Sequence, residues 1–131
     1  MATLAFCVLG SGSGGNCTAI VLDPDGPGPL PPRVLLIDVG LSPKTTRRRL
    51  GEVGLRFADV TDILLTHLDS DHLHPSWPAA LFHNERIHMH VHARHEPALR
   101  ETAINERRLC VIDDERAPGA RQGSCPRAPT A

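Results

Sequence analysis

Short apolar segments alternate with stretches of glycine, proline and polar residues along most of the chain. Apolar segments of about four to eight residues that are bounded by such turn-forming residues are typical of β-strands. The pattern predicts six strands, at Thr3–Leu9, Cys17–Leu22, Val34–Ile37, Asp62–Thr66, Arg86–His92 and Leu109–Ile112.

Three other segments favour helices. Ser42 is a typical N-cap followed by a proline suited to the first helical turn, so we expect a helix over Lys44–Val53, closed by Gly54. A short helix is expected over Pro75–His83, and Glu96–Arg107 has a weaker helical pattern. The apolar face of the second helix is expected to consist of Trp77, Leu81 and Phe82.

The composition fits one small domain with a hydrophobic core, because 40% of the 131 residues are hydrophobic. The formal net charge of −1 gives no overall field that would attract nucleic acid or an anionic membrane. Neither a signal peptide nor an apolar run of membrane-spanning length is evident, so a soluble, cytoplasmic protein is expected. The four cysteines occur singly without a C-x-x-C pair, which favours reduced thiols.

The most specific feature is a cluster of potential metal ligands directly after the apolar segment 63–65. Alternate side chains of an extended segment share a face, so His67 and Asp69 would point the same way. A turn after Ser70 would bring the next two donors to the same point. The cluster predicts a bound cation, with His67, Asp69, Asp71 and His72 as its ligands.

Two other segments lie near this cluster in the predicted order of elements. Asp38 follows the apolar strand Val34–Ile37, at a strand end where α/β proteins commonly build sites; it either caps a turn or supports the cluster. The glycine-rich segment Gly10–Asn16 lacks the lysine and hydroxyl ending of a nucleotide-binding loop. We therefore expect no nucleotide site there, and a tight turn passing near an active site instead.

The remaining histidines and the arginine run allow more than one interpretation. Segment 86–92 alternates, with Ile87, Met89 and Val91 expected in the core. The histidines His88, His90 and His92 are expected on the other side. These histidines would form a polar face, lie under a helix, or bind a metal. His74 is interpreted as a loop histidine. The basic run Arg47–Arg49 is either a solvated helix face or a contact for a phosphate-bearing substrate.

Three motifs, Gly10–Cys17, Leu36–Ser42 and Leu64–His72, resemble the opening half of the metallo-β-lactamase superfamily, most of all its small bacterial YycJ/WalJ-type branch. The resemblance implies the N-terminal half of an αββα sandwich, an α/β fold with a mixed sheet and helices on one face. It also implies a hydrolase with two divalent metals, zinc, manganese or iron, acting on phosphodiester or related ester bonds. The resemblance places His67 on the first metal, Asp71 and His72 on the second, and Asp38 behind them as a bracing acid. Asp71 is the residue expected to be catalytic.

The chain departs from the pattern of this family at two positions. Asp69 replaces the second histidine, and a carboxylate is a harder donor that shifts metal preference away from zinc. Leu73–His74–Pro75 replaces the glycine that usually precedes the helix.

The resemblance covers residues 1–113, whereas residues 114–131 lack periodicity and are expected to form a disordered tail. The later motifs of the family are not found, so the chain is interpreted as an N-terminal fragment with an incomplete domain. Two protein donors for each metal predict weak binding, and a missing second half predicts an uncovered apolar sheet face that drives self-association. Three functions stay open: a hydrolase completed by a second chain, a non-catalytic metal-binding or interaction remnant, and a nucleic-acid binder using Arg47–Arg49.

Overall fold

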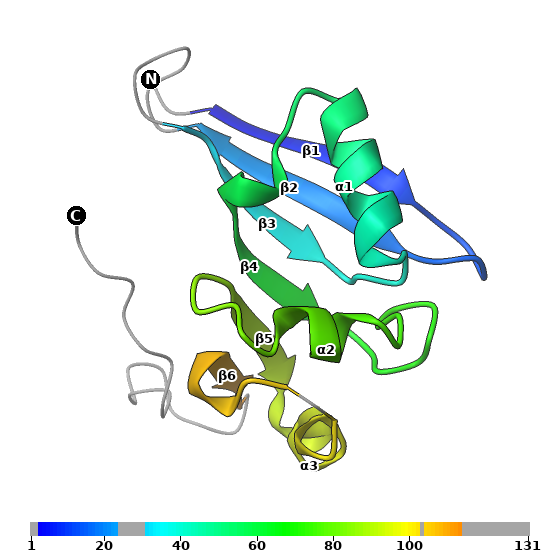
Figure 1. The fold of residues 1–131 in the computed structure, drawn as a ribbon, viewed down its shortest axis with the longest axis vertical. Helices are drawn as coiled ribbons and strands as arrows, with labels where there is room; N and C mark the ends of the chain where they lie inside the picture. The colour runs from blue at the N-terminus through cyan, green and yellow to red at the C-terminus, as the bar shows by residue number, and fades with distance from the viewer. Residues whose placement is uncertain (1–2, 24–30, 103, 114–131) are drawn as a thin grey trace.

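A single six-stranded sheet organises the protein, and its strands lie side by side in the order in which they occur along the chain (Figure 1). The computed structural model describes residues 3–23, 31–102 and 104–113. The strands are β1 (Thr3–Gly10), β2 (Cys17–Asp23), β3 (Arg33–Ile37), β4 (Val60–Leu65), β5 (His88–His92) and β6 (Leu109–Ile112).

The sheet is mixed. β2 runs antiparallel to both β1 and β3, whereas β3, β4, β5 and β6 are mutually parallel. Five of the six strands therefore share one direction, and their carboxyl ends meet at one edge of the sheet. The segments that follow them include the glycine-rich loop, Asp38, the ligand cluster after β4 and His95 after β5.

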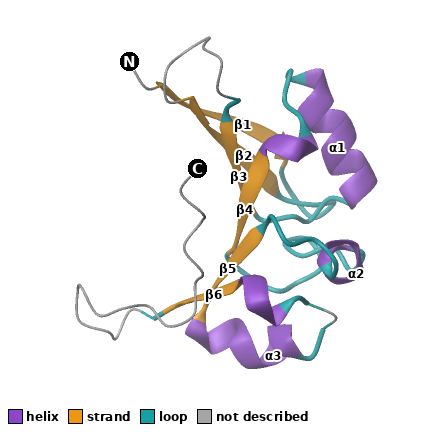
Figure 2. Ribbon diagram, turned by 60° about the vertical axis from the view of Figure 1, so that its left-hand side comes forward, coloured by secondary structure: helices purple, strands orange, loops and turns teal. Residues whose placement is uncertain are grey.

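All described helices cover the same face of the sheet (Figure 2). The α-helices are α1 (Pro43–Glu52), α2 (Trp77–Leu81) and α3 (Glu96–Arg100). Three 3-10 turns, η1 (Phe57–Asp59), η2 (Ala93–His95) and η3 (Glu106–Arg108), join them to the strands.

Helix α1 has the predicted caps, and each of its ends lies one residue before that of the predicted Lys44–Val53. The Ser42 hydroxyl accepts a hydrogen bond from the Thr45 amide at 3.2 Å, which satisfies one of the unpaired donors of the first turn. Gly54 follows the helix with a φ of 78°, a left-handed conformation that glycine adopts without steric cost.

The core fills the space between this helical layer and the sheet. Trp77, Leu50 and Ile63 are all completely buried there. The Trp77 ring lies 5.9 Å from the Phe57 ring, centroid to centroid, and its indole N–H donates to the Leu41 carbonyl at 2.7 Å. The buried indole is thus packed and hydrogen-bonded, and it ties α2 to the loop that precedes α1.

The opposite face of the sheet carries no helix within the part of the chain that the structure describes (Figure 2). Leu4 and Phe6 of the edge strand β1 are each 74% exposed, and Val8 is 55% exposed. These observations confirm the predicted fold class, a mixed sheet with helices on one face. None of the described helices is long and apolar enough to cross a membrane.

Two predicted helices are shorter than expected. Helix α2 occupies only Trp77–Leu81, and Phe82 is 47% exposed and does not belong to its apolar face. At 100° per residue, Phe82 is turned well away from the side shared by Trp77 and Leu81. In the predicted segment 96–107, α3 ends at Arg100, and Asn105 caps a separate 3-10 turn by accepting from the Arg107 amide at 3.1 Å.

The expectation of reduced thiols holds for Cys7 and Cys17, which are free, but is wrong for Cys110, which is disulfide-bonded. Sequence spacing detects local cysteine pairs, whereas a disulfide needs only two Cβ atoms about 4 Å apart in the fold. The expected tail at 114–131 lies outside the described residues.

Candidate metal centre

Asp38 is the central acid of the candidate site. It lies immediately after β3, is only 6% exposed, and has a φ of 61°, which is uncommon for a residue other than glycine. Its carboxylate accepts hydrogen bonds from the Thr66 amide at 2.8 Å and the Thr66 hydroxyl at 2.7 Å. It also accepts from Nδ1 of His72 at 2.9 Å. Asp38 therefore connects the end of β3 to both ends of the ligand cluster.

These contacts decide which nitrogen of each histidine is available to a metal. Nδ1 of His72 donates to the Asp38 carboxylate, so its Nε2 keeps the lone pair. The Thr66 hydroxyl uses its single proton for Asp38 and can only accept from Nδ1 of His67, which lies 3.2 Å away. His67 thereby takes the same tautomer. The network therefore leaves the Nε2 lone pairs of both histidines free to bind a metal.

The His67 and His72 rings lie together, with centroids 4.9 Å apart. The Asp71 carboxylate lies 3.7 Å from Nε2 of His72. The hydrogen bond to Asp38 is the main reason why the pKa of His72 is raised above its ordinary value, and the negative charges of Asp38, Asp71 and Asp69 act in the same direction. The site is therefore electronegative and suited to a cation.

The glycine-rich loop reaches this site through backbone contacts. The Asn16 amide donates to the Asp71 carbonyl at 2.7 Å, and the Asn16 side-chain amide lies 3.4 Å from the Asp71 carboxylate. The Gly40 amide donates to the Asn16 carbonyl at 2.9 Å. A Cβ atom at Gly40 would lie 1.8 Å from the Asp71 carbonyl oxygen, so glycine is required at this close approach.

The four predicted ligands do not converge on one point. Among the residues that the structure describes, no three His, Cys, Asp or Glu side chains are arranged to hold a metal ion. Asp69 is exposed, and its backbone carbonyl accepts from the His72 and Leu73 amides at 2.8 Å each. β4 ends at Leu65, so strand alternation does not extend to His67 and Asp69, and the assignment of the four ligands stays a prediction.

The other histidines named by the sequence have different partners. Nδ1 of His74 accepts from the Ser76 amide at 3.2 Å, as expected of a loop histidine. On β5, Nε2 of His90 lies 2.9 Å from the Asp62 carboxylate, and Nε2 of His88 lies 3.1 Å from the Arg108 guanidinium. His88 is 8% exposed, so it is not on a solvated face, and burial lowers its pKa. His88 and His90 therefore each have a side-chain partner within the described part of the chain.

His95 was not predicted to belong to the site. It ends η2, directly after β5, and its ring centroid lies 6.4 Å from that of His67. Its Nε2 is buried and has no hydrogen-bond partner. A sequence signal did exist, since the segments after two adjacent parallel strands meet at one sheet edge.

The three arginines of the predicted basic run, Arg47–Arg49, each contact a different group. The Arg47 guanidinium stacks over the Phe57 ring, 4.7 Å from its centroid. Arg48 lies 3.9 Å from Glu52, and Arg49 donates to the Leu9 carbonyl of β1. The three arginines therefore do not form one solvated face.

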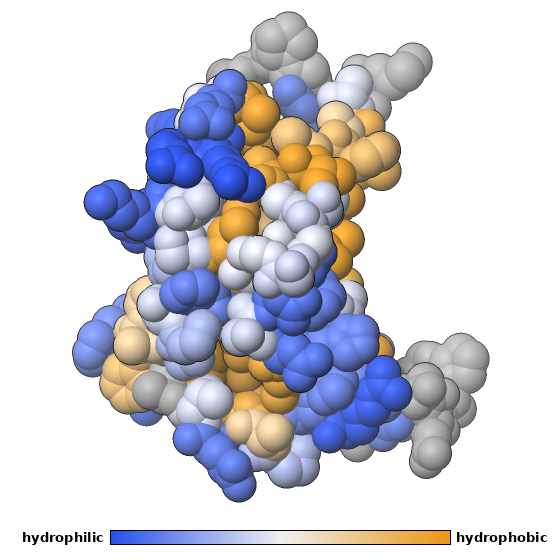
Figure 3. Space-filling model, turned by 90° about the vertical axis from the view of Figure 1, so that its right-hand side faces the viewer, coloured by the Kyte–Doolittle hydropathy of each residue, from blue (hydrophilic) through white to orange (hydrophobic). Residues whose placement is uncertain are grey.

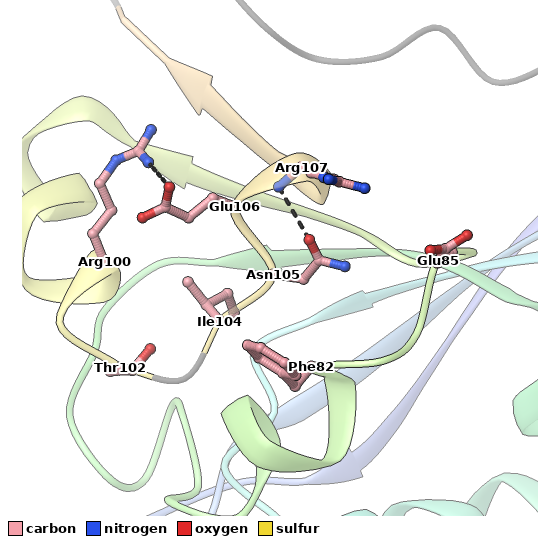
Figure 4. Close-up of a pocket in the computed structure, with 8 residues that line it drawn as sticks. All are labelled: Phe82, Glu85, Arg100, Thr102, Ile104, Asn105, Glu106 and Arg107. Atoms are coloured by element: carbon pink, nitrogen blue, oxygen red, sulfur yellow. Dashed lines mark hydrogen bonds and ion pairs between the residues drawn. The ribbon is translucent and has the colours of Figure 1, made fainter.

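A cavity of about 490 Å³ lies apart from the candidate ligands, between the end of α2 and segment 100–107 (Figure 4). Its lining includes Phe82 and Ile104, and an ion pair of 3.0 Å between Arg100 and Glu106. None of the predicted metal ligands lines this cavity, so we do not assign it to the site.

Figure 3 views the molecule from the right of Figure 1, toward which the β3 and β4 arrows point. Hydrophobic residues reach the surface there in an upper and a lower area, and a band of hydrophilic residues separates them.

Comparison with known proteins identifies similar chains. The family model described as "Metallo-beta-lactamase superfamily" matches residues 13–119. "Exodeoxyribonuclease YycJ" of Bacillus anthracis is 40% identical over 70 residues, which cover 53% of this chain and 24% of that protein. The crystal structure of human tRNase Z, short form (ELAC1), is 21% identical, with a TM-score of 0.41, over 96% of this chain and 49% of that chain. The chain thus spans about a quarter of the curated relative.

Proposed function

Because this chain belongs to the metallo-beta-lactamase superfamily, we propose that it is a metal-dependent hydrolase that cleaves phosphodiester bonds. The observation that carries this proposal is the network centred on Asp38. It holds the rings of His67 and His72 with centroids 4.9 Å apart and leaves Nε2 of each as a donor. Pre-oriented imidazoles backed by a carboxylate are a typical arrangement of histidine ligands to metals.

The donors fit a pair of divalent cations. His67 and Asp69 would hold the first, and Asp71 and His72 would hold the second, with Asp38 bracing the two histidines. Two carboxylates and two imidazoles suit manganese or iron as well as zinc. Two protein donors for each ion predict weak, exchangeable binding. When bound, such ions lower the pKa of water and stabilise the charge that develops on the scissile phosphate.

The chain's own residues would orient the reactants. Asp38 fixes the tautomers of the two histidines, and Asn16 and Gly40 hold the Asp71 backbone at the sheet edge. The Asp71 carboxylate is the group we assign to take the proton from the attacking water, since it lies beside Nε2 of His72 and is not fully buried.

The substrate class is proposed from the relative's name. The protein that shares 40% identity with this chain over 70 residues is described as an exodeoxyribonuclease, which acts on DNA phosphodiester bonds. We therefore place a nucleic acid ahead of a small-molecule ester as the substrate.

A second candidate function is a metal-binding or interaction protein without turnover. It is favoured by two observations. No three described His, Cys, Asp or Glu side chains are arranged to hold a metal ion, and the match covers only 24% of the exodeoxyribonuclease. This candidate requires at most one weakly bound metal and no hydrolysis.

Hydrolysis of bis-p-nitrophenyl phosphate by the full chain, with manganese or zinc added, separates the two functions. We expect metal-dependent turnover that falls by at least about a hundredfold in His67→Ala, because removing a ligand abolishes assembly of the site. His83→Ala, an exposed histidine outside the site, should leave the rate unchanged. Absence of turnover with every metal tested, in monomer and oligomer alike, would leave only the non-catalytic candidate.

A further inference from the structure

We propose that His95 is an additional metal ligand of this centre, an inference that rests on the proposed metal-dependent function. It is carried by the position of His95 beside His67 and by the unpaired Nε2 of its ring. His95 belongs to none of the three motifs that define the predicted site.

The topology brings the two histidines together. β4 and β5 are parallel neighbours, with Leu65 paired to Val91, so the segments that follow them leave the sheet side by side. His67 lies two residues beyond the end of β4, and His95 ends the 3-10 turn that follows β5. The centroid distances are 6.4 Å from His95 to His67 and 4.9 Å from His67 to His72.

The unpaired nitrogen is the second observation. A buried polar atom without a partner costs roughly 1–3 kcal/mol, so such atoms usually have a ligand, a water or an ion to satisfy them. The only other described side chain with such an atom is Asp23, at the carboxyl end of the antiparallel strand β2 and hence at the far edge of the sheet. At the edge that carries the candidate ligands, His95 is therefore the one described residue with this feature.

The distances agree with ligation after a small movement. Two imidazoles bound tetrahedrally to one zinc at about 2.0–2.1 Å have ring centroids roughly 5 Å apart. The centroids of His67 and His95, the two imidazoles proposed for the first ion, lie 6.4 Å apart, about 1 Å more than this separation. His67 is exposed, so a rotation of its side chain can close this gap without disturbing the core.

The proposal also addresses the shortage of donors. A catalytic zinc usually has three protein ligands and one open position. His67 and Asp69 would supply two donors to the first ion, and His95 would supply the third. The imidazole also compensates in part for the histidine that Asp69 replaces in the sequence pattern, since it restores a softer nitrogen donor to that ion.

Titration of the full chain with cobalt(II) tests the proposal without any activity measurement. We expect wild type to give the visible absorption of cobalt in a four-coordinate site, and His95→Ala to weaken cobalt and zinc affinity at least about tenfold and reduce that absorption. His95→Gln, which keeps the size of the side chain, should weaken affinity similarly. His83→Ala is the matched control and should bind as wild type does.

Three outcomes would overturn the proposal. If wild type binds cobalt and both His95 variants bind it equally with the same spectrum, His95 is not a ligand, although the proposed function stands. If the variants bind metal normally and only the KM for bis-p-nitrophenyl phosphate rises, His95 contacts the substrate phosphate instead. If wild type binds no metal, the proposed function and this inference fail together. Circular dichroism of each variant distinguishes these outcomes from loss of the fold.

Discussion

The carboxylate of Asp38 accepts a hydrogen bond from Nδ1 of His72, a residue 34 positions later in the chain, at 2.9 Å. We expect Asp38→Asn to weaken zinc or manganese binding by about 10- to 100-fold, because an amide holds the imidazole less firmly and does not raise the basicity of Nε2. Competition with a fluorescent chelator measures this change directly.

The choice of asparagine matters for this test. Asp38 has a φ of 61°, which asparagine tolerates and alanine does not. Asp38→Ala should therefore lose a further ~1 kcal/mol of unfolding free energy through backbone strain. Wild-type metal affinity in Asp38→Asn would show that the acid does not orient His72.

Gly40 is predicted to be indispensable for the fold. A Cβ atom there would lie 1.8 Å from the Asp71 carbonyl oxygen, a backbone atom that cannot move aside cheaply. Gly40→Ala should lower the free energy of unfolding by about 3 kcal/mol in urea, followed by the fluorescence of the single tryptophan.

The matched control is a glycine without such neighbours. Gly51 lies within α1, and a Cβ atom there would meet nothing within 4 Å. Gly51→Ala should raise the unfolding free energy by about 0.5–1 kcal/mol, because alanine is the better helix former. Equal effects of the two substitutions would contradict the close packing at Gly40.

Asp62 should make stability depend on pH in acid. The hydrogen bond from His90 is the main reason why the pKa of the Asp62 carboxyl is lowered, and Thr61 and Arg33 act in the same direction. A carboxyl group with a lowered folded pKa stabilises the fold above its unfolded pKa of about 3.9. That stabilisation is lost as the pH falls through the lower, folded pKa.

The substitution Asp62→Asn isolates this contribution. At pH 7 the variant should be less stable than wild type by on the order of 1 kcal/mol, and the difference should vanish once the wild-type carboxyl is protonated. Glu85→Gln, an exposed acid, serves as the control. A difference that persists unchanged into strong acid would mean that packing, and not the charge of Asp62, is responsible.

The apolar side of β1 is predicted to drive association between copies of the chain. Leu4, Phe6 and Val8 are all exposed there, and β1 is an edge strand of the described sheet. Phe6→Lys should shift the protein from oligomer toward monomer in sedimentation experiments, since a charge on an edge strand opposes pairing. Val53→Lys, at another exposed apolar position, should not.

The sequence was most informative where one short segment determines its own structure. Helix α1 begins after Ser42 as predicted, because a hydroxyl cap followed by proline is sufficient to start a helix. The β6 bounds and the edge of the sheet that carries Asp38 were also predicted from local patterns.

Features that depend on distant contacts were not predictable. The strand β4 ends at Leu65, one residue earlier than expected, so His67 and Asp69 lie in the segment that follows the strand. His95 was not predicted, because its proximity to His67 depends on the pairing of β4 with β5. Likewise, Phe82 was expected on the apolar face of α2, but the helix is short and Phe82 lies outside it.

The order of the strands has a consequence for synthesis on the ribosome. Each strand from β2 onward pairs with the strand that precedes it in the chain, so none has to be inserted between two strands that are already paired. The sheet can therefore grow one strand at a time as the polypeptide emerges, and Asp38 leaves the ribosome before its partner His72. Chain elongation itself would then assemble the candidate centre, from the bracing acid to the ligands and last to His95.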